Sequence, residues 1–168
     1  MNAWTRNAVF ALVAVAVAAG IWFALVQKSV APEASFKTIK GEVVTTADLR
    51  GKVVLVNFWA TSCEVCVHEM PEIVRTYVKY RDRGFETVAV AMSYDPPNRV
   101  LEYTDKNALP FKVALDVSGE LARRFGDVSM TLTTFVIDRR GRIVARILGE
   151  PDFGALHALL EARLGESA

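Results

Sequence analysis

Two cysteines, the only ones in the chain, lie three positions apart directly after a short apolar segment. They are Cys63 and Cys66, and the apolar segment covers residues 53–58. An apolar run of this length is typical of a buried strand, and the residues after the first cysteine are typical of a helix. A strand that delivers a C-x-x-C pair to the first turn of a helix is the arrangement of a dithiol redox site.

The two cysteines are expected to have different roles. Cys63 falls at the helix start, where free N–H groups and the positive end of the helix dipole stabilise a thiolate, so we expect it to be the nucleophile. Cys66 is one turn further on, and Met70, Ile73 and Tyr77 continue its apolar face, so it should be the shielded resolving thiol. Two packed, inert cysteines are the alternative, whereas a zinc site lacks a second pair of ligands.

The residues around the cysteines resemble a known family. The Asn-Phe-Trp-Ala-x-x-Cys-x-x-Cys stretch resembles the thioredoxin superfamily, and its flanks are similar to the membrane-anchored TlpA/ResA-like branch. The resemblance covers roughly residues 34–165. It implies a thioredoxin fold and a thiol-disulfide oxidoreductase whose redox-active Cys63–Cys66 disulfide needs no other cofactor. The matching stretches are residues 51–57, 57–66, 63–71, 89–95 and 133–141.

The order of the apolar segments predicts an α/β fold for residues 32–168, because strands and helices alternate before a terminal hairpin and helix. Residues 94–116 form a β/α insertion relative to plain thioredoxin, as in the resembling branch. Strands are expected at 53–58, 85–92, 111–115, 133–137 and 142–148, after a small hairpin at 36–44. Helices are expected at 63–83, 99–107, 118–125 and from Phe153 to Leu164.

Residues 1–31 predict a membrane anchor and tether. Ala8 to Val26 is an uninterrupted apolar run of 19 residues, which as a transmembrane helix would span roughly 28 Å, about one hydrocarbon core. A cleavable signal is the alternative, since residues 16–18 have the small-x-small form of a cleavage site. The apolar run continues beyond that point, which favours an uncleaved anchor. Both readings export the remainder of the chain.

An exported reactive dithiol fits an oxidising compartment, so we expect a single anchor in a bacterial inner membrane and a domain in the periplasm. Of the 20 basic residues, Arg6 and Lys28 precede Ala31. The chain from Ala31 on therefore has 18 basic and 19 acidic residues and is nearly neutral. No basic patch with stacking aromatics points to nucleic acid. The resemblance implies partners that carry disulfides, such as apocytochrome c or copper-site assembly proteins, and a membrane electron donor for re-reduction.

Three polar residues are expected to tune the cysteines. Glu69 borders the apolar stripe, so its partly desolvated carboxyl should have a raised pKa and exchange protons with a thiol; it matches the active-site Glu of the resembling branch. A solvated helix acid is the alternative. Asn57 stands where thioredoxins carry a buried Asp, which leaves proton transfer to Glu69. Glu64 disfavours the Cys63 thiolate, and so favours a reductase over a disulfide-introducing oxidase, unless water screens its charge.

Leu132 departs from the family pattern, which has a cis proline facing the cysteines at this point. A non-proline cis bond costs roughly 2.5–4 kcal/mol. Either Leu132 holds a strained cis bond, or the loop is trans and the substrate cleft is reshaped. The resemblance assigns substrate binding to this edge, with the backbone of Thr131 pairing to substrate and Trp59 packing beside the site.

A non-enzymatic copper-binding module is the competing class of function. Cys63 and Cys66 would be its soft ligands, and His157 could be imagined as a third. Copper-delivery relatives use a C-x-x-x-C pair and a distal loop histidine instead, so no metal site is expected.

Overall fold

The structure is a computed structural model that describes residues 12–17 and 30–166. The chain divides into two compact units, Met1–Val30 and Ala31–Ala168. In the first unit residues 12–17 are helical. Most of the expected membrane segment lies outside the described residues. Among the residues described, no helix has the length and apolar character needed to cross a membrane.

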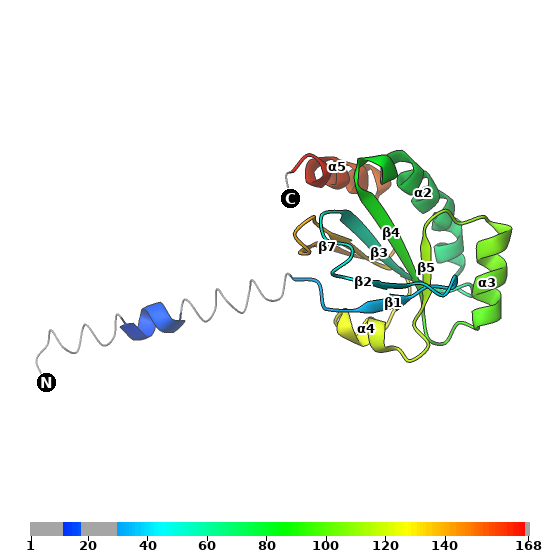
Figure 1. The fold of residues 1–168 in the computed structure, drawn as a ribbon, viewed down its shortest axis with the longest axis horizontal. Helices are drawn as coiled ribbons and strands as arrows, with labels where there is room; N and C mark the ends of the chain where they lie inside the picture. Colours follow the sequence, from blue (N-terminus) through cyan, green and yellow to red (C-terminus); the bar gives the residue numbers. More distant parts are fainter. Residues whose placement is uncertain (1–11, 18–29, 167–168) are drawn as a thin grey trace, which may run out of the picture. The chain divides into compact units, whose positions relative to one another are not determined.

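A five-stranded sheet in the order β5-β4-β3-β6-β7 forms the centre of the second unit (Figure 1). The central strand β3 (Val53–Trp59) runs parallel to β4 (Phe85–Ala91) and antiparallel to β6 (Thr133–Ile137). On the outer sides, β5 (Lys112–Leu115) is parallel to β4 and β7 (Ile143–Leu148) is antiparallel to β6. The expected α/β fold is confirmed.

The remaining elements also follow the expected order, with most ends shifted by one or two residues. The small hairpin turns through Gly41, whose φ of 84° lies in the left-handed region that glycine adopts without strain. The first long helix contains Pro71 and is followed by a short 3-10 turn, η1 (Arg81–Arg83). The other elements are β1 (Ser35–Lys37), β2 (Val43–Thr45), α2 (Glu64–Tyr80), α3 (Pro97–Lys106), α4 (Glu120–Arg124) and α5 (Phe153–Leu164).

Every residue of β3 is buried, and alternate side chains enter two separate cores. Val53, Leu55 and Trp59 pack with α2 and α5, where the last helix contributes Leu156, Leu160 and Leu164. The intervening residues of β3 pack with the hairpin and α4. By the same alternation Asn57 faces α2, and this is what brings its amide to the helix that carries the cysteines.

The strands of the sheet begin and end at two opposite edges, and these edges carry different parts of the structure. Because β3 and β4 are parallel, their carboxyl ends share one edge, where the cysteines follow β3. The opposite edge holds the start of β3 and the β6–β7 turn, since Val54 pairs with Ile137. The length of β3 places these edges about 20 Å apart.

Candidate active site

The cysteines lie where the sequence predicts them. Cys63 is half-buried and is the N-cap of α2, and Cys66 is fully buried one turn into the helix. The two form a disulfide. The backbone N–H of Cys66 donates to the Cys63 sulfur at 3.2 Å, a bond that favours a thiolate at Cys63 once the pair is reduced.

Asp95 holds the turn that leads into Cys63, and sequence reasoning missed this role. Its buried carboxylate accepts hydrogen bonds from the Thr61 backbone N–H and from the Thr61 hydroxyl, both at 2.6 Å. Asp95 comes from the loop after β4, at the same edge as the cysteines. The available signal was an Asp just after a buried strand whose carboxyl end should meet that of β3.

Glu69 is only 1% exposed although it is charged at high pH. One carboxyl oxygen accepts a hydrogen bond from the Asn57 amide at 3.2 Å, and the other has no partner among the described residues. Burial raises the pKa of Glu69 to about 7. The hydrogen bond from Asn57 lowers this pKa, and the negative charge of Glu150 raises it. The expected raised pKa is confirmed. Near neutral pH this carboxyl can therefore both release and accept a proton.

The Asn57 amide joins Glu69 to the neighbouring strand. The same nitrogen donates to the Thr134 hydroxyl at 2.9 Å, because Asn57 and Thr134 are directly paired between β3 and β6. An amide can donate to the Glu69 carboxyl, whereas an aspartate here would place two acids together. Sequence reasoning did not single out Thr134, whose role depends on strand register.

Leu132 adopts the second of its two expected alternatives. No peptide bond among the described residues is cis, and Leu132 has a φ of 64°. Its N–H donates to the carbonyl of Phe58 at 3.0 Å, and its own carbonyl accepts from Gly149 at 2.8 Å. The left-handed conformation costs a non-glycine residue about 1–2 kcal/mol. The hydrogen bonds to β3 and to the end of β7 hold the loop in it.

The other residues assigned to this edge differ in accessibility. Thr131 is half-buried, and within residues 30–166 its backbone N–H and C=O have no hydrogen-bond partner, so both are available to an extended substrate. Trp59 is fully buried against Tyr103, with ring centroids 5.2 Å apart. The structure therefore gives Trp59 a packing position, and its part in substrate binding stays a prediction. Glu64 is exposed, so water screens its effect on Cys63.

Four exposed apolar side chains belong to the segments that meet at the disulfide. Val65 stands between the cysteines, Met130 precedes Thr131, and Leu148 precedes the glycine bonded to Leu132. Tyr94 precedes Asp95, which binds the Cys63 turn. These positions make an apolar rim suited to contact with another polypeptide.

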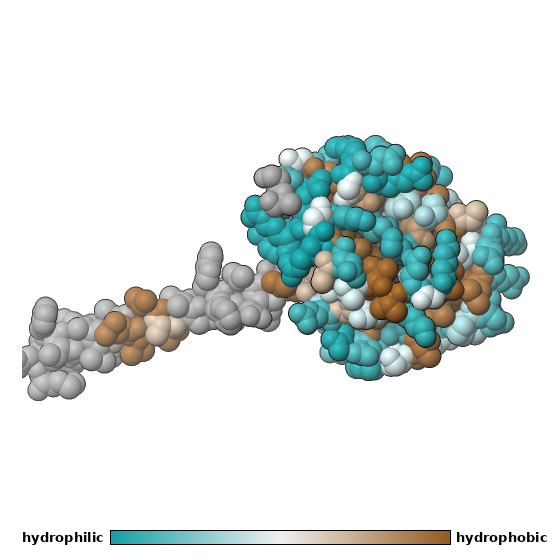
Figure 2. Space-filling view, in the orientation of Figure 1, coloured by the Kyte–Doolittle hydropathy of each residue, from teal (hydrophilic) through white to brown (hydrophobic). Residues whose placement is uncertain are grey.

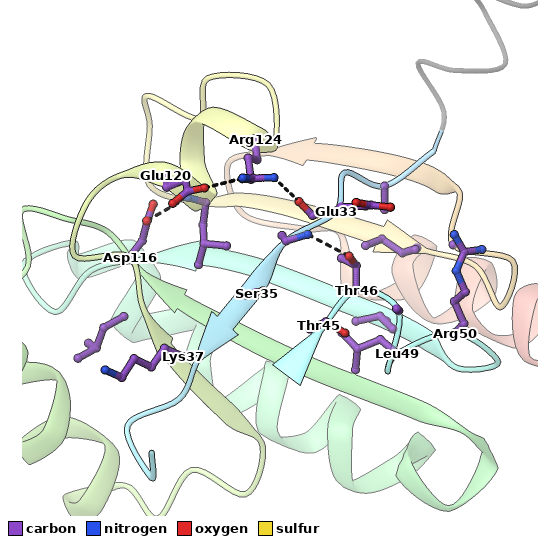
Figure 3. A pocket seen from close by; sticks show the side chains of 18 of the residues that line it. Glu33, Ser35, Lys37, Thr45, Thr46, Leu49, Arg50, Asp116, Glu120 and Arg124 are labelled. Carbon is purple, nitrogen blue, oxygen red and sulfur yellow. Dashed lines mark hydrogen bonds and ion pairs between the residues drawn. The ribbon is translucent and has the colours of Figure 1, made fainter. Parts of the chain in front are cut away.

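A large cavity lies elsewhere in the domain. It has a volume of about 940 Å³, opens between the hairpin, α4 and the β6–β7 turn, and is lined by neither cysteine (Figure 3). Figure 2 shows that the viewed face of the domain is mostly hydrophilic, with apolar patches between. The disulfide lies beside the exposed apolar rim instead, with Cys63 half-buried and Cys66 fully buried.

His157 does not join the cysteines. Its Nε2 lies 2.9 Å from the Thr76 hydroxyl, and Thr76 is ten residues beyond Cys66, about 15 Å along α2. Within the part of the chain that the structure describes, no three His, Cys, Asp or Glu side chains gather into a possible metal site.

The chain matches known proteins over most of its length. The Redoxin family model matches residues 26–160. The thiol-disulfide oxidoreductase ResA of Bacillus thuringiensis subsp. konkukian is 32% identical over 120 residues, which are 71% of this chain and 68% of the relative.

Solved structures give the same result. A candidate thioredoxin from Neisseria meningitidis has a TM-score of 0.76 and 38% identity, and the match covers 80% of this chain and 89% of that one. A candidate thiol:disulfide interchange protein DsbE from Chlorobium tepidum has a TM-score of 0.74 and 30% identity, with coverage of 82% and 96%.

Glu69 should make the disulfide-bonded protein less stable as pH rises. The folded state holds this proton more tightly than the unfolded chain, so stability is lost between pH 4.5 and about 7, by at most about 3 kcal/mol. Glu69→Gln should flatten this slope in urea unfolding measured across that range. Glu102→Gln, an exposed acid on α3, should keep it. Identical slopes for the wild type and Glu69→Gln would show that Glu69 titrates like an ordinary surface acid.

The left-handed backbone of Leu132 predicts that a glycine variant is more stable than an alanine variant. This is the reverse of the order found inside helices and strands. Leu132→Gly and Leu132→Ala lose the same packing, but only glycine relieves the left-handed strain. The glycine variant should therefore be the more stable by about 1 kcal/mol, as measured by thermal melting. An alanine variant of equal or greater stability would contradict this loop conformation.

Proposed function

The chain belongs to the Redoxin family and is a thiol-disulfide oxidoreductase, and we propose that it is a membrane-anchored periplasmic reductase of disulfides in other proteins. The observation that carries the proposal is the unequal placement of Cys63 and Cys66 at the start of α2, with a carboxyl of raised pKa one turn beyond. The reaction needs no cofactor besides the cysteine pair.

In the first step the Cys63 thiolate attacks one sulfur of the substrate disulfide. A bond forms between Cys63 and that sulfur, the substrate disulfide breaks, and its other sulfur leaves as a thiolate that takes up a proton. The helix start and the Cys66 N–H stabilise the attacking thiolate. The free backbone groups of Thr131 and the apolar rim hold the substrate segment.

In the second step Cys66 loses its proton and attacks the Cys63 sulfur. The mixed disulfide breaks, the second substrate sulfur leaves as a thiolate that takes up a proton, and the Cys63–Cys66 disulfide forms. Two electrons have then passed from the cysteine pair to the substrate, and each of its two sulfurs has taken up a proton. Glu69 lies one turn from Cys66 on the same face of α2, so it is the group proposed to accept the Cys66 proton.

Reduction is favoured over disulfide introduction by the acids at this end of the domain. Glu64 lies between the cysteines and Glu69 lies one turn beyond Cys66, so both oppose negative charge near the cysteines. Weaker stabilisation of the thiolate makes the dithiol a better reductant. Screening at exposed Glu64 leaves buried Glu69 as the larger influence. A disulfide-introducing oxidase remains the competing direction.

The proposed location rests on the apolar run from Ala8 to Val26, which is long enough to cross a bilayer. A reductase in an oxidising compartment needs a source of electrons, so a membrane electron donor is proposed to re-reduce the disulfide. Substrates of the apocytochrome c or copper-site assembly type follow from the resemblance to the TlpA/ResA-like branch.

Single cysteine variants should separate the two steps. Cys63→Ser should reduce disulfide reductase activity to the uncatalysed rate, because it removes the nucleophile. Cys66→Ser should trap substrate as a mixed disulfide on Cys63, visible by non-reducing electrophoresis and mass spectrometry. Ser62→Ala, at an exposed neighbouring position, is the matched control and should trap nothing. Mixed disulfides on Cys66 in the Cys63→Ser variant would reverse the two roles.

The direction of electron flow should appear in the reduction potential. Equilibration with glutathione should give a value nearer thioredoxin's, roughly −270 mV, than the roughly −120 mV of a strong oxidant. A value above about −180 mV would identify an oxidase.

Copper content of the purified protein, measured beside reductase activity, tests the copper-binding alternative.

A further inference from the structure

Two turns are locked together at the edge of the sheet opposite the disulfide. Gly51 and Arg139 bond reciprocally: the Gly51 N–H donates to the Arg139 carbonyl at 2.9 Å, and the Arg139 guanidinium donates to the Gly51 carbonyl at 2.7 Å. The same guanidinium also donates to the carbonyls of Arg83 and Leu164, both at 3.2 Å. The Arg139 guanidinium therefore holds the two turns together through internal hydrogen bonds.

Four basic side chains project from these braced turns: Arg50, Lys52, Arg140 and Arg142, which we call the arginine edge. All four are exposed. Arg50 uses one nitrogen to donate to the Arg140 carbonyl at 3.0 Å, and its remaining donors are uncommitted. The arginine edge is therefore a pre-formed surface.

The arginine edge carries uncompensated positive charge. Arg142 is paired with buried Asp138 at 2.7 Å, and Lys52 lies 3.7 Å from buried Glu86, which Lys112 also binds. Within residues 30–166 neither the Arg50 guanidinium nor the Arg140 guanidinium has a carboxylate partner. In Figure 3 Arg50 lies at the end of the cavity away from the acids Asp116 and Glu120.

The domain begins at this same place. The N–H of Ala31, its first residue, donates to the carbonyl of Gly141 at 2.8 Å, between the two exposed arginines of the β6–β7 turn. The chain therefore leaves the domain beside the arginine edge. If the preceding segment is anchored in a bilayer, the point where the domain is attached lies beside the arginine edge.

We propose that the arginine edge docks on anionic phospholipid headgroups and so holds the domain with its disulfide turned away from the membrane. The disulfide is at the opposite edge, about 20 Å away along β3. Docking would present the apolar rim to proteins of the aqueous compartment, and the undocked state would let the disulfide reach the proposed membrane electron donor. This proposal rests on the proposed anchor, because the anchor supplies the proximity that so few charges need.

The size of the effect is modest for each residue, as expected for exposed charges. A Lys or Arg near an anionic surface changes the ratio of docked to free domain on the order of fivefold. Loss of Arg50 and Arg140 together should therefore lower the ratio about thirtyfold. High salt should have the same effect, since the Debye length falls to about 3 Å at 1 M.

The test uses the full chain in nanodiscs that contain a gadolinium-headgroup lipid. Discs of phosphatidylcholine alone are compared with discs of equal parts phosphatidylcholine and phosphatidylglycerol. Paramagnetic broadening should be several-fold stronger in the anionic discs at the amides of residues 50–52 and 139–142, and weak at Cys63 and Cys66. Arg50→Ala with Arg140→Ala should abolish the difference. Arg99→Ala with Lys106→Ala, which removes equal charge from α3, should preserve it.

A second pair of variants separates charge from folding. Arg50→Lys with Arg140→Lys keeps the charge and should keep the broadening, whereas loss of broadening there would tie the alanine result to the Arg50–Arg140 bond and overturn the proposal. Equal broadening in both lipids, or strongest broadening at the disulfide, would also overturn it while leaving the anchor intact. Failure of the chain to remain in the discs would refute the anchor and docking together. Reductase activity of the same sample reports separately on the chemistry.

Discussion

The burial of β3 on both faces is the constraint on which the rest of the structure depends. All seven of its residues are buried, so the strand needs a covering layer on each side and a neighbour on each edge. The helices α2 and α5 supply one layer, and the hairpin with α4 supplies the other. A strand fixed so completely delivers the residues after it to one defined position, and the cysteines are those residues.

Asn57 is the polar exception within this apolar strand, and it connects the core to the chemistry. Its amide binds a carboxyl on the cysteine helix and a hydroxyl on β6. A buried amide NH2 group left without acceptors would be costly, so these two acceptors also specify how β3, α2 and β6 fit together. The position of Glu69, and hence its retained proton, is therefore set by the packing of the core.

Periodicity predicted the strands, the helices and the separate placements of Cys63 and Cys66, because a buried strand and an amphipathic helix leave strong local patterns. Glu69 was also predictable, since its spacing from Cys66 puts it at the border of the apolar face. The roles of Asp95 and Thr134 depend on which strands become neighbours. The left-handed backbone of Leu132 depends on hydrogen bonds to residues far away in the chain. The arginine edge combines basic residues from separate turns, so no stretch of sequence displays it.

The last helix has a consequence for the order of biosynthesis. Leu156, Leu160 and Leu164 complete the core that contains Cys66, and the end of α5 is held by Arg139. Since α5 follows every strand in the chain, that core cannot close until this helix has been synthesised. Cys66 is therefore the one of the two cysteines whose enclosure has to wait for nearly the whole domain.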